Sequence, residues 1–301
     1  MSTPSTNVLP SFLKPLEDLA LREGSTRALG VVRIGLVLIL WSRWGRGLSL
    51  FRHIEADWWL LALMFWASTI PLLLGWKTRF FSAMTGVTIV GLVVYLGGIR
   101  EFEPYTHHHT TLLAILSCLM AFTPCGRSFS LDRWFAVKDA RAKGLPLPLE
   151  QGPQWATWII LFQISSVYIF SSIDKLHIGW LSGERMEAIV IYYYFHSIRP
   201  DWPGFSTLMM LSGSGAVVLE LSLAVGLWSR RLRPFLLPIG IAFHLVIYVT
   251  LPVNTFSATM VLFYLLFIPP AAVHTFIETL VAKPPAPSNR PTDVDPGSDV
   301  I

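Results

Sequence analysis

The sequence predicts an all-α integral membrane protein: a polytopic bundle of about eight transmembrane helices with one further interfacial or re-entrant helix. Of its 301 residues, 53% are hydrophobic and only 14% are charged, whereas about 25% of a soluble globular chain is charged. The mean hydropathy is +0.55. Apolar runs of about 20 residues, the length that a bilayer core requires, recur from Ala28 to Leu280 without a polar block large enough for a second core.

Three parts are expected along the chain: a polar N-terminal segment at 1–25, a membrane domain at 26–282, and a tail at 283–301. The tail is rich in Pro, Ser and Asp, so we expect it to be disordered. Eight apolar stretches of the membrane domain have, or nearly have, the length of a span. In chain order these are 28–44, 57–76, 82–99, 108–124, 154–174, 206–228, 234–252 and 256–280.

The distribution of basic residues orients these spans. Fifteen of the 23 Lys and Arg residues fall on the side of the N-terminus and seven on the other side, with Arg33 left inside the first span. By the positive-inside rule, both termini are expected in the cytosol of a multi-pass cell-membrane protein. The net charge of +4 then reflects orientation in the lipid bilayer, and no nucleic-acid partner is expected. Segment 182–196 lies in an outer loop and is too short to cross, so we expect an interfacial or re-entrant helix there.

A polar face marks the end of the fifth span. Ser165, Tyr168, Ser172 and Lys175 recur at i, i+3, i+7 and i+10, so they share one side of a helix. In a membrane such a side must face the bundle interior or a water-filled cavity. Lys175 has two interpretations: a lysine that snorkels to the membrane boundary, or a partly desolvated lysine that acts as a base.

The run His107-His108-His109 opens the fourth span. Neighbouring helical side chains point about 100° apart, so the three cannot bind one metal, and no metal site is expected. They are either interfacial histidines that bond headgroups or loop carbonyls, or one of them, His109, turns inward as an orienting group or proton carrier.

Two further charges lie deep in the membrane domain. Arg33 is about 8 Å inside the first span, and Glu220 is about 12 Å from the cytosolic end of the sixth. Their matching depths predict a structural ion pair between two helices, with a proton path as the alternative. His244, near the middle of the seventh span, is a candidate buried polar partner in either arrangement.

Three segments then carry a family resemblance. They are SSIDKLHIGWLSGE, which is the most specific, HHHTTLLAILSCLMAFTPCGRSFSLDRW, and GAVVLELSLAVGLWSRRLRP followed by IAFHLVIY. Together they resemble the vitamin K-dependent γ-carboxylase superfamily, and in particular its HTTM (horizontally transferred transmembrane) members, over roughly residues 26–280. The resemblance implies a carboxylase-like lyase with Lys175 as the base and His109 as its assistant. A reduced, vitamin K-like quinone would be the cofactor, and we expect Tyr168 and Ser172 to line its pocket.

The resemblance does not include the large extracytosolic region with which animal carboxylases bind a propeptide, which argues against γ-carboxylation of proteins. Two hypotheses follow. In the first, the chain is a quinol-dependent membrane enzyme that uses Lys175. In the second, it is a non-enzymatic membrane factor for the export, maturation or immunity of a secreted peptide. An apolar cleft where Lys175 and His109 converge favours the enzyme, and its absence favours the factor.

Overall fold

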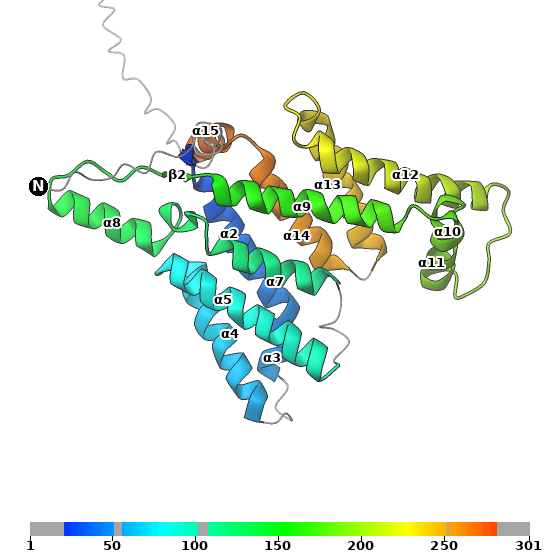
Figure 1. The fold of residues 1–301 in the computed structure, drawn as a ribbon, viewed down its shortest axis with the longest axis horizontal. Coiled ribbons are helices and arrows are strands. Elements are labelled where there is room, and N and C mark those ends of the chain that lie inside the picture. Colours follow the sequence, from blue (N-terminus) through cyan, green and yellow to red (C-terminus); the bar gives the residue numbers. More distant parts are fainter. Residues whose placement is uncertain (1–20, 51–55, 102–107, 252, 282–301) are drawn as a thin grey trace, which may run out of the picture.

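The structure is a computed structural model that describes residues 21–50, 56–101, 108–251 and 253–281. The described chain is mainly helical (Figure 1). Its one sheet pairs two short antiparallel strands, β1 (Glu23–Ser25) and β2 (Gln151–Pro153). The strands join the start of the chain to the segment before the fifth predicted span, a contact that the apolar pattern did not predict.

The first half of the chain forms one side of the bundle, coloured blue to green-cyan in Figure 1. Its first helix continues through a π-helical turn into a short helix that ends at Leu50. Of the two long helices that follow, one packs between the first helix and the other, and the second also packs against the helix that begins at His108. The elements are α2 (Arg27–Leu40), η2 (Trp41–Gly45), α3 (Arg46–Leu50), α4 (Ala56–Leu74), α5 (Thr78–Leu92), η3 (Val93–Ile99), α7 (His108–Met120), η4 (Cys125–Arg127) and α8 (Leu131–Ala142).

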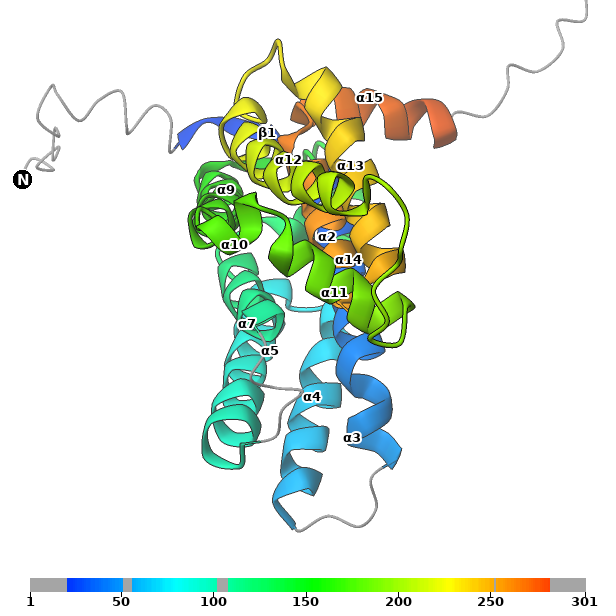
Figure 2. The ribbon, with the colours of Figure 1, turned by 90° about the vertical axis from the view of Figure 1, so that its right-hand side faces the viewer.

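The second half covers the other side. Its elements are α9 (Trp155–Asp174), α10 (Ile178–Leu181), α11 (Glu184–Tyr194), α12 (Phe205–Gly226), α13 (Arg233–Thr250), α14 (Asn254–Tyr264), η5 (Leu265–Phe267) and α15 (Pro270–Val281). Helix α12 packs along α9, and α13 packs along α14. A helix was expected within segment 182–196, and α11 occupies it. It packs against α12 (Figure 2), while its depth in a membrane stays a prediction.

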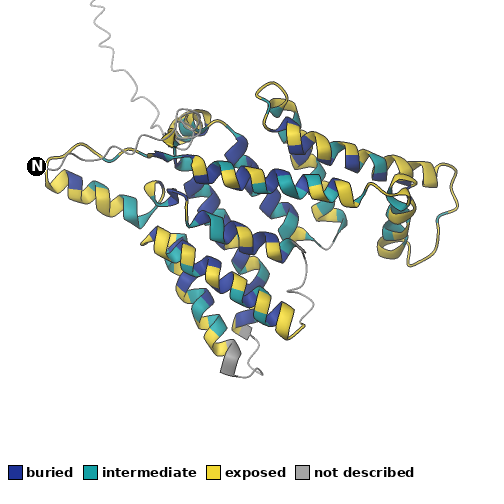
Figure 3. Cartoon of the chain, in the orientation of Figure 1, coloured by how far each residue is buried: buried dark blue, intermediate teal, exposed yellow. Residues whose placement is uncertain are grey.

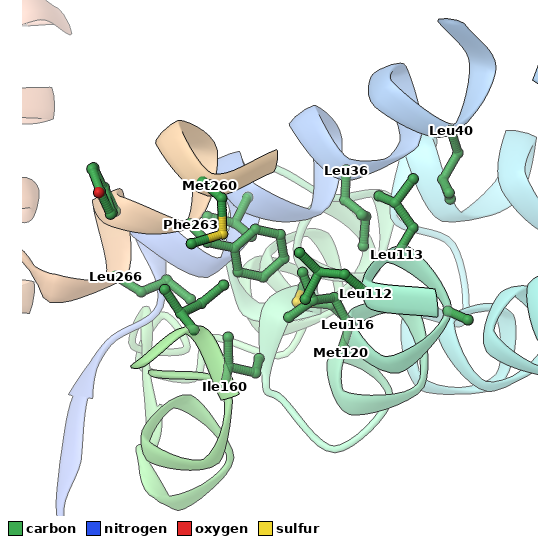
Figure 4. Close-up of a cluster of buried hydrophobic side chains, with 14 of the residues drawn as sticks. Leu36, Leu40, Leu112, Leu113, Leu116, Met120, Ile160, Met260, Phe263 and Leu266 are labelled. Atoms are coloured by element: carbon green, nitrogen blue, oxygen red, sulfur yellow. The ribbon is translucent and has the colours of Figure 1, made fainter. Parts of the chain in front are cut away.

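The core lies where α2, α7, α9 and α14 meet. Figure 4 shows apolar side chains from these helices interdigitating, among them Leu36, Leu113, Ile160 and Phe263. Burial is concentrated at this centre, whereas α11 and much of α12 are exposed (Figure 3). The exposed side chains of the long helices are themselves largely apolar. Because a soluble protein rarely presents such continuous apolar surface, this exterior indicates lipid as the solvent.

The number of spans differs from the expectation. Within the described residues, five helices are long and apolar enough to cross a bilayer, or six if α14–η5 and α15 count as one bent span. Two apolar helices, Trp59–Leu74 and His109–Met120, are shorter. Each of the eight predicted stretches therefore contains a helix, but eight spans are not confirmed.

The stretch 256–280 was predicted as one span, and the structure bends it by 100° between η5 and α15. Pro269 and Pro270 stand at the break. Proline has no backbone N–H to donate, and it disfavours helical geometry in the residue before it. Two successive prolines therefore end the helix here, where a single proline such as Pro238 is accommodated inside α13.

Helix α8, which the apolar pattern did not predict, fixes the turn between α4 and α5. The Asp132 carboxylate accepts hydrogen bonds from the backbone N–H groups of Lys77 and Thr78, at 2.7 and 2.8 Å. The turn needs left-handed backbone at Gly75, with φ of 71°. A Cβ there would lie 2.4 Å from that of Ser130, so glycine is required for both conformation and space.

Candidate functional site

Lys175 immediately follows α9 and meets a carboxylate of α12. Its Nζ donates to both carboxylate oxygens of Glu220, at 3.0 and 2.9 Å. The ammonium also donates to the backbone oxygen of Ser171 at 3.2 Å and to its hydroxyl. The Lys175 side chain is 16% exposed and that of Glu220 is 8% exposed. The pair is therefore enclosed by helices but still reachable at the lysine.

Ser171 connects the two charged groups. Its hydroxyl accepts from Lys175 and lies 3.2 Å from the Glu220 carboxylate, to which it donates. Spacing explains this arrangement, because residues 171 and 175 are four apart on α9 and therefore adjacent on its surface. The three side chains form a closed hydrogen-bonded set in which a proton has a short path between nitrogen and carboxylate.

Helix α10 covers this site. The Trp180 ring centroid lies 5.5 Å from the Lys175 Nζ, which is within cation–π range. Close packing holds α10 in place, since a Cβ at Gly213 of α12 would lie 2.5 Å from the Trp180 backbone oxygen. Gly183 has a positive φ of 85°, and a Cβ there would lie 2.3 Å from the Met210 nitrogen. These two glycines let the α10–α11 segment reach the lysine.

A second polar cluster lies deeper in the bundle. The Tyr168 hydroxyl is 2.6 Å from Nε2 of His244 and also hydrogen-bonds the hydroxyl of Tyr264. The three groups come from α9, α13 and α14, and all three residues are buried. Gly240 makes room, because a Cβ there would lie 2.6 Å from the Tyr264 hydroxyl. His244 thus has tyrosine partners in place of the charged residues considered from the sequence.

The polar side of α9 faces the bundle, as its spacing predicted. Ser165, Tyr168 and Ser172 are buried, and Lys175 is half-buried. Ser165 accepts from the Trp228 indole at 2.7 Å, and Ser172 donates to the Tyr168 backbone oxygen at 2.8 Å. The hydroxyls of Tyr168 and Ser172 are thus held by protein partners. Their expected role in lining a quinone pocket stays a prediction.

The expected ion pair between Arg33 and Glu220 is wrong, because Glu220 pairs with Lys175. Arg33 is fully buried and donates instead to the backbone oxygens of Cys125 and Phe129, at 2.9 and 2.5 Å. The register of α12 explains the error. Trp228 meets Ser165 while Glu220 reaches the end of α9, so α12 is shifted along α9 and Glu220 lies at the level of Lys175.

His109 lies half-buried in the first turn of α7, and α7 packs against α9. The contacts described for Lys175 come from α9, α10 and α12, so its convergence with His109 stays a prediction. His107 lies outside the described residues, as does the side chain of His108.

Glu220 is the partner of Lys175 that the sequence analysis did not predict. Its signal was a carboxylate inside an apolar helix, which the membrane tolerates only when it is paired.

Two cavities open at the other end of α9, near the small sheet. The first, of about 690 Å³, lies between the α4–α5 turn, α8 and β2, with Thr78, Asp132 and Gln151 among its lining residues. The second, of about 710 Å³, lies between the start of α9, the α12–α13 turn and the η5–α15 break. Neither is lined by Lys175 or His109.

Comparison with known proteins gives one match. The family model described as the HTTM domain matches residues 46–271, which is most of the chain. No curated protein and no solved structure matches it. The matched region includes the lysine, the carboxylate and the tyrosine–histidine cluster described above.

Proposed function

The chain belongs to the HTTM family, and from this premise we propose that it is a membrane enzyme in which Lys175 acts as a general base. The observation that carries the proposal is the hydrogen-bonded pair of Lys175 and Glu220, at 2.9 and 3.0 Å, partly open at the lysine. Ionisable residues are costly in a membrane domain and usually serve a function there. In this pair the ammonium carries a proton and the carboxylate can accept it.

The base step needs only groups of this chain and an acidic substrate. The Lys175 ammonium transfers a proton to the Glu220 carboxylate, which yields a neutral amine and a carboxylic acid. The amine then accepts the proton of a weakly acidic substrate hydroxyl, which leaves the substrate as its anion beside a new ammonium. Ser171 touches both groups and orients the transfer.

The chemistry suits a membrane-soluble substrate with a weakly acidic hydroxyl. A reduced quinone belongs to this class and is the molecule that the family resemblance implies, so it is the first substrate to assay. Trp180 offers an aromatic face beside the ammonium, on the side from which Lys175 is reachable. His109 is proposed as an assisting group, because it opens a helix that packs against α9.

The test uses Lys175→Arg in purified protein reconstituted into nanodiscs. Arginine keeps the positive charge opposite Glu220, but its guanidinium cannot be deprotonated in a protein. We expect the oxidation of reduced quinone by dissolved dioxygen, the electron acceptor in the assay, to fall by about 10²-fold or more, since general base catalysis contributes about 10²–10⁴. Lys143→Arg is the matched control, because Lys143 pairs with Asp139 on the exposed surface of α8. Undiminished turnover by Lys175→Arg would reject the base.

Lys175 is proposed to face the extracytosolic side, with both termini in the cytosol of a cell membrane. The asymmetry of basic residues supports this orientation. Single cysteines at exposed Asp201 and Arg231, in the loops on opposite ends of α12, test it with a membrane-impermeant label. Labelling of intact cells is expected at position 201 and not at 231. The opposite result would invert the orientation.

A second candidate is a non-enzymatic membrane factor for the export, maturation or immunity of a secreted peptide. The observation in its favour is that Glu220 and Ser171 already satisfy the Lys175 ammonium, as in a purely structural pair. This candidate predicts no quinone turnover by the native protein. It also predicts that Lys175→Arg supports the peptide's maturation as well as lysine does.

A further inference from the structure

The second cavity has a cationic mouth and an apolar wall. Arg22, Arg230 and Arg233 line it, and Glu23 is the one carboxylate among its lining residues. Its inner wall includes Trp158, Leu161, Trp228, Leu266 and Phe267. The cavity of about 710 Å³ therefore matches a molecule with an anionic head and an apolar body.

Two of the three arginine side chains have no partner among the residues that the structure describes. Among the described residues, neither the Arg22 nor the Arg230 guanidinium has a hydrogen-bond or ion-pair partner, and both residues are exposed. Arg233 is partly engaged, since its Nε donates to the Leu227 backbone oxygen at 2.8 Å. Nearby carboxylates are committed elsewhere: Glu150 pairs with Arg27, and Glu278 pairs with Arg27 and His274. The described residues that line the cavity, three arginines against the one carboxylate of Glu23, thus carry more positive than negative charge.

Unsatisfied donors lie in the same wall. Within the described residues, the Thr157 hydroxyl and the Trp158 indole nitrogen are buried without a hydrogen-bond partner, and both residues line the cavity. A buried donor without an acceptor is unfavourable. The Trp158 ring stacks on that of Trp228, with centroids 5.8 Å apart and planes inclined by 18°. These donors are enclosed by the wall, and the stacked rings offer a flat apolar surface beside them, against which an acyl chain can pack.

The position of the cavity identifies the source of the anion. It opens where α9 begins, where α12 gives way to α13, and where the last apolar stretch breaks before α15. The ends of membrane helices lie at the level of the lipid headgroups. We propose that this cavity is a binding site for an anionic phospholipid, with its phosphate between Arg22, Arg230 and Arg233 and its chain along the tryptophans.

The test compares phosphatidylglycerol with phosphatidylcholine. The purified full-length protein, held in phosphatidylcholine nanodiscs, is supplied with each lipid in turn, and retained lipid is counted by native mass spectrometry. We expect preferential retention of phosphatidylglycerol. The double variant Arg22→Gln/Arg230→Gln should lose about tenfold or more of that preference, since each basic residue contributes about 1 kcal/mol near an anionic surface. Arg231→Gln is the matched control, because Arg231 is adjacent and exposed but does not line the cavity.

Two further measurements distinguish the effects of charge, of folding and of the source of the anion. Arg22→Lys/Arg230→Lys keeps the charge, so it should keep most of the preference even if the glutamine variant folds poorly. Inorganic phosphate, added as a soluble competitor, should not displace the lipid at matched concentration, because it lacks the apolar body. Equal retention of the two lipids by the native protein would overturn the site. So would equal loss in the Arg231→Gln control, or displacement by inorganic phosphate alone.

Discussion

Two buried cations of this bundle, Arg33 on α2 and Lys175 at the end of α9, have opposite surroundings. Arg33 is fully enclosed and donates to two backbone carbonyls. Lys175 keeps 16% of its side chain exposed and faces a carboxylate. A guanidinium does not release its proton in a protein and a carbonyl does not accept one, whereas an ammonium and a carboxylate exchange protons readily. Burial alone therefore does not distinguish the two cations, but their partners do, because only Lys175 faces a group that can accept its proton.

The Arg33 side of this comparison carries the largest expected effect on stability. Arg33→Met would leave the buried Cys125 carbonyl and the part-buried Phe129 carbonyl without the guanidinium donor, at about 1–3 kcal/mol for each buried group. We expect the free energy of unfolding in micelles to fall by about 3 kcal/mol or more. Arg33→Lys should recover only part of this loss, because one ammonium lacks the forked geometry that reaches both oxygens. Arg230→Met, at an exposed position, is the control and should change stability by less than about 0.5 kcal/mol. A loss that small for Arg33→Met would show that the loop holds without the arginine.

At Lys175 the expected effect on the free energy of unfolding is smaller, and it depends on the partner carboxylate of Glu220. Glu220→Gln leaves the ammonium without its carboxylate and should cost about 1–3 kcal/mol, the cost of an enclosed polar group that loses its partner. Adding Lys175→Met removes that charge and should restore part of the loss. A double-mutant cycle on unfolding measures this coupling. The matched cycle of Arg33 with Glu220 should be additive within about 0.3–0.5 kcal/mol, because the two share no partner. Additivity in the first cycle, or coupling in the second, would reverse the pairing seen in the structure.

The sequence was informative about helices and faces but not about neighbours. Apolar length located a helix in each of the eight stretches, and spacing on α9 correctly turned Ser165, Tyr168 and Ser172 inward. Both results follow from the local geometry of a single helix, which the length of an apolar stretch and the spacing of its polar residues reveal. The partner of Glu220 depends instead on how far α12 slides along α9, a quantity that no single-helix pattern contains.

Shorter features escaped prediction for a related reason. Strands β1 and β2 have three residues each, which is too few for an alternating pattern, and they pair residues far apart in the chain. Helix α8 is polar enough to be missed by a search for apolar runs. Pro269 and Pro270 mark the break before α15, but the apolar stretch continues through them, so apolar length alone predicted one span. To predict the 100° bend, the two adjacent prolines have to be considered together.

The smallest expected effect comes from an ion pair outside the spans, between Glu187 of α11 and Arg199. Their side chains, 20% and 62% exposed, meet at 2.5 Å, and Ser206 hydrogen-bonds both. The hydrogen bond from Arg199 lowers the pKa of Glu187 below its ordinary value of 4.5. A depressed carboxyl pKa gives stability that is present above the unfolded value and lost as the pH falls through the folded one. Unfolding temperatures measured from about pH 6 to about pH 3 should therefore fall slightly more steeply for the native protein than for Arg199→Gln. Arg185→Gln on the same helix is the control and should follow the native slope.

Salt should weaken the Glu187 pair, because exposed charges are screened, and should leave the cost of Glu220→Gln nearly unchanged, because that pair is enclosed. Identical pH slopes for native and Arg199→Gln, or equal salt sensitivity of the two pairs, would contradict the distinction between enclosed and exposed ion pairs in this protein.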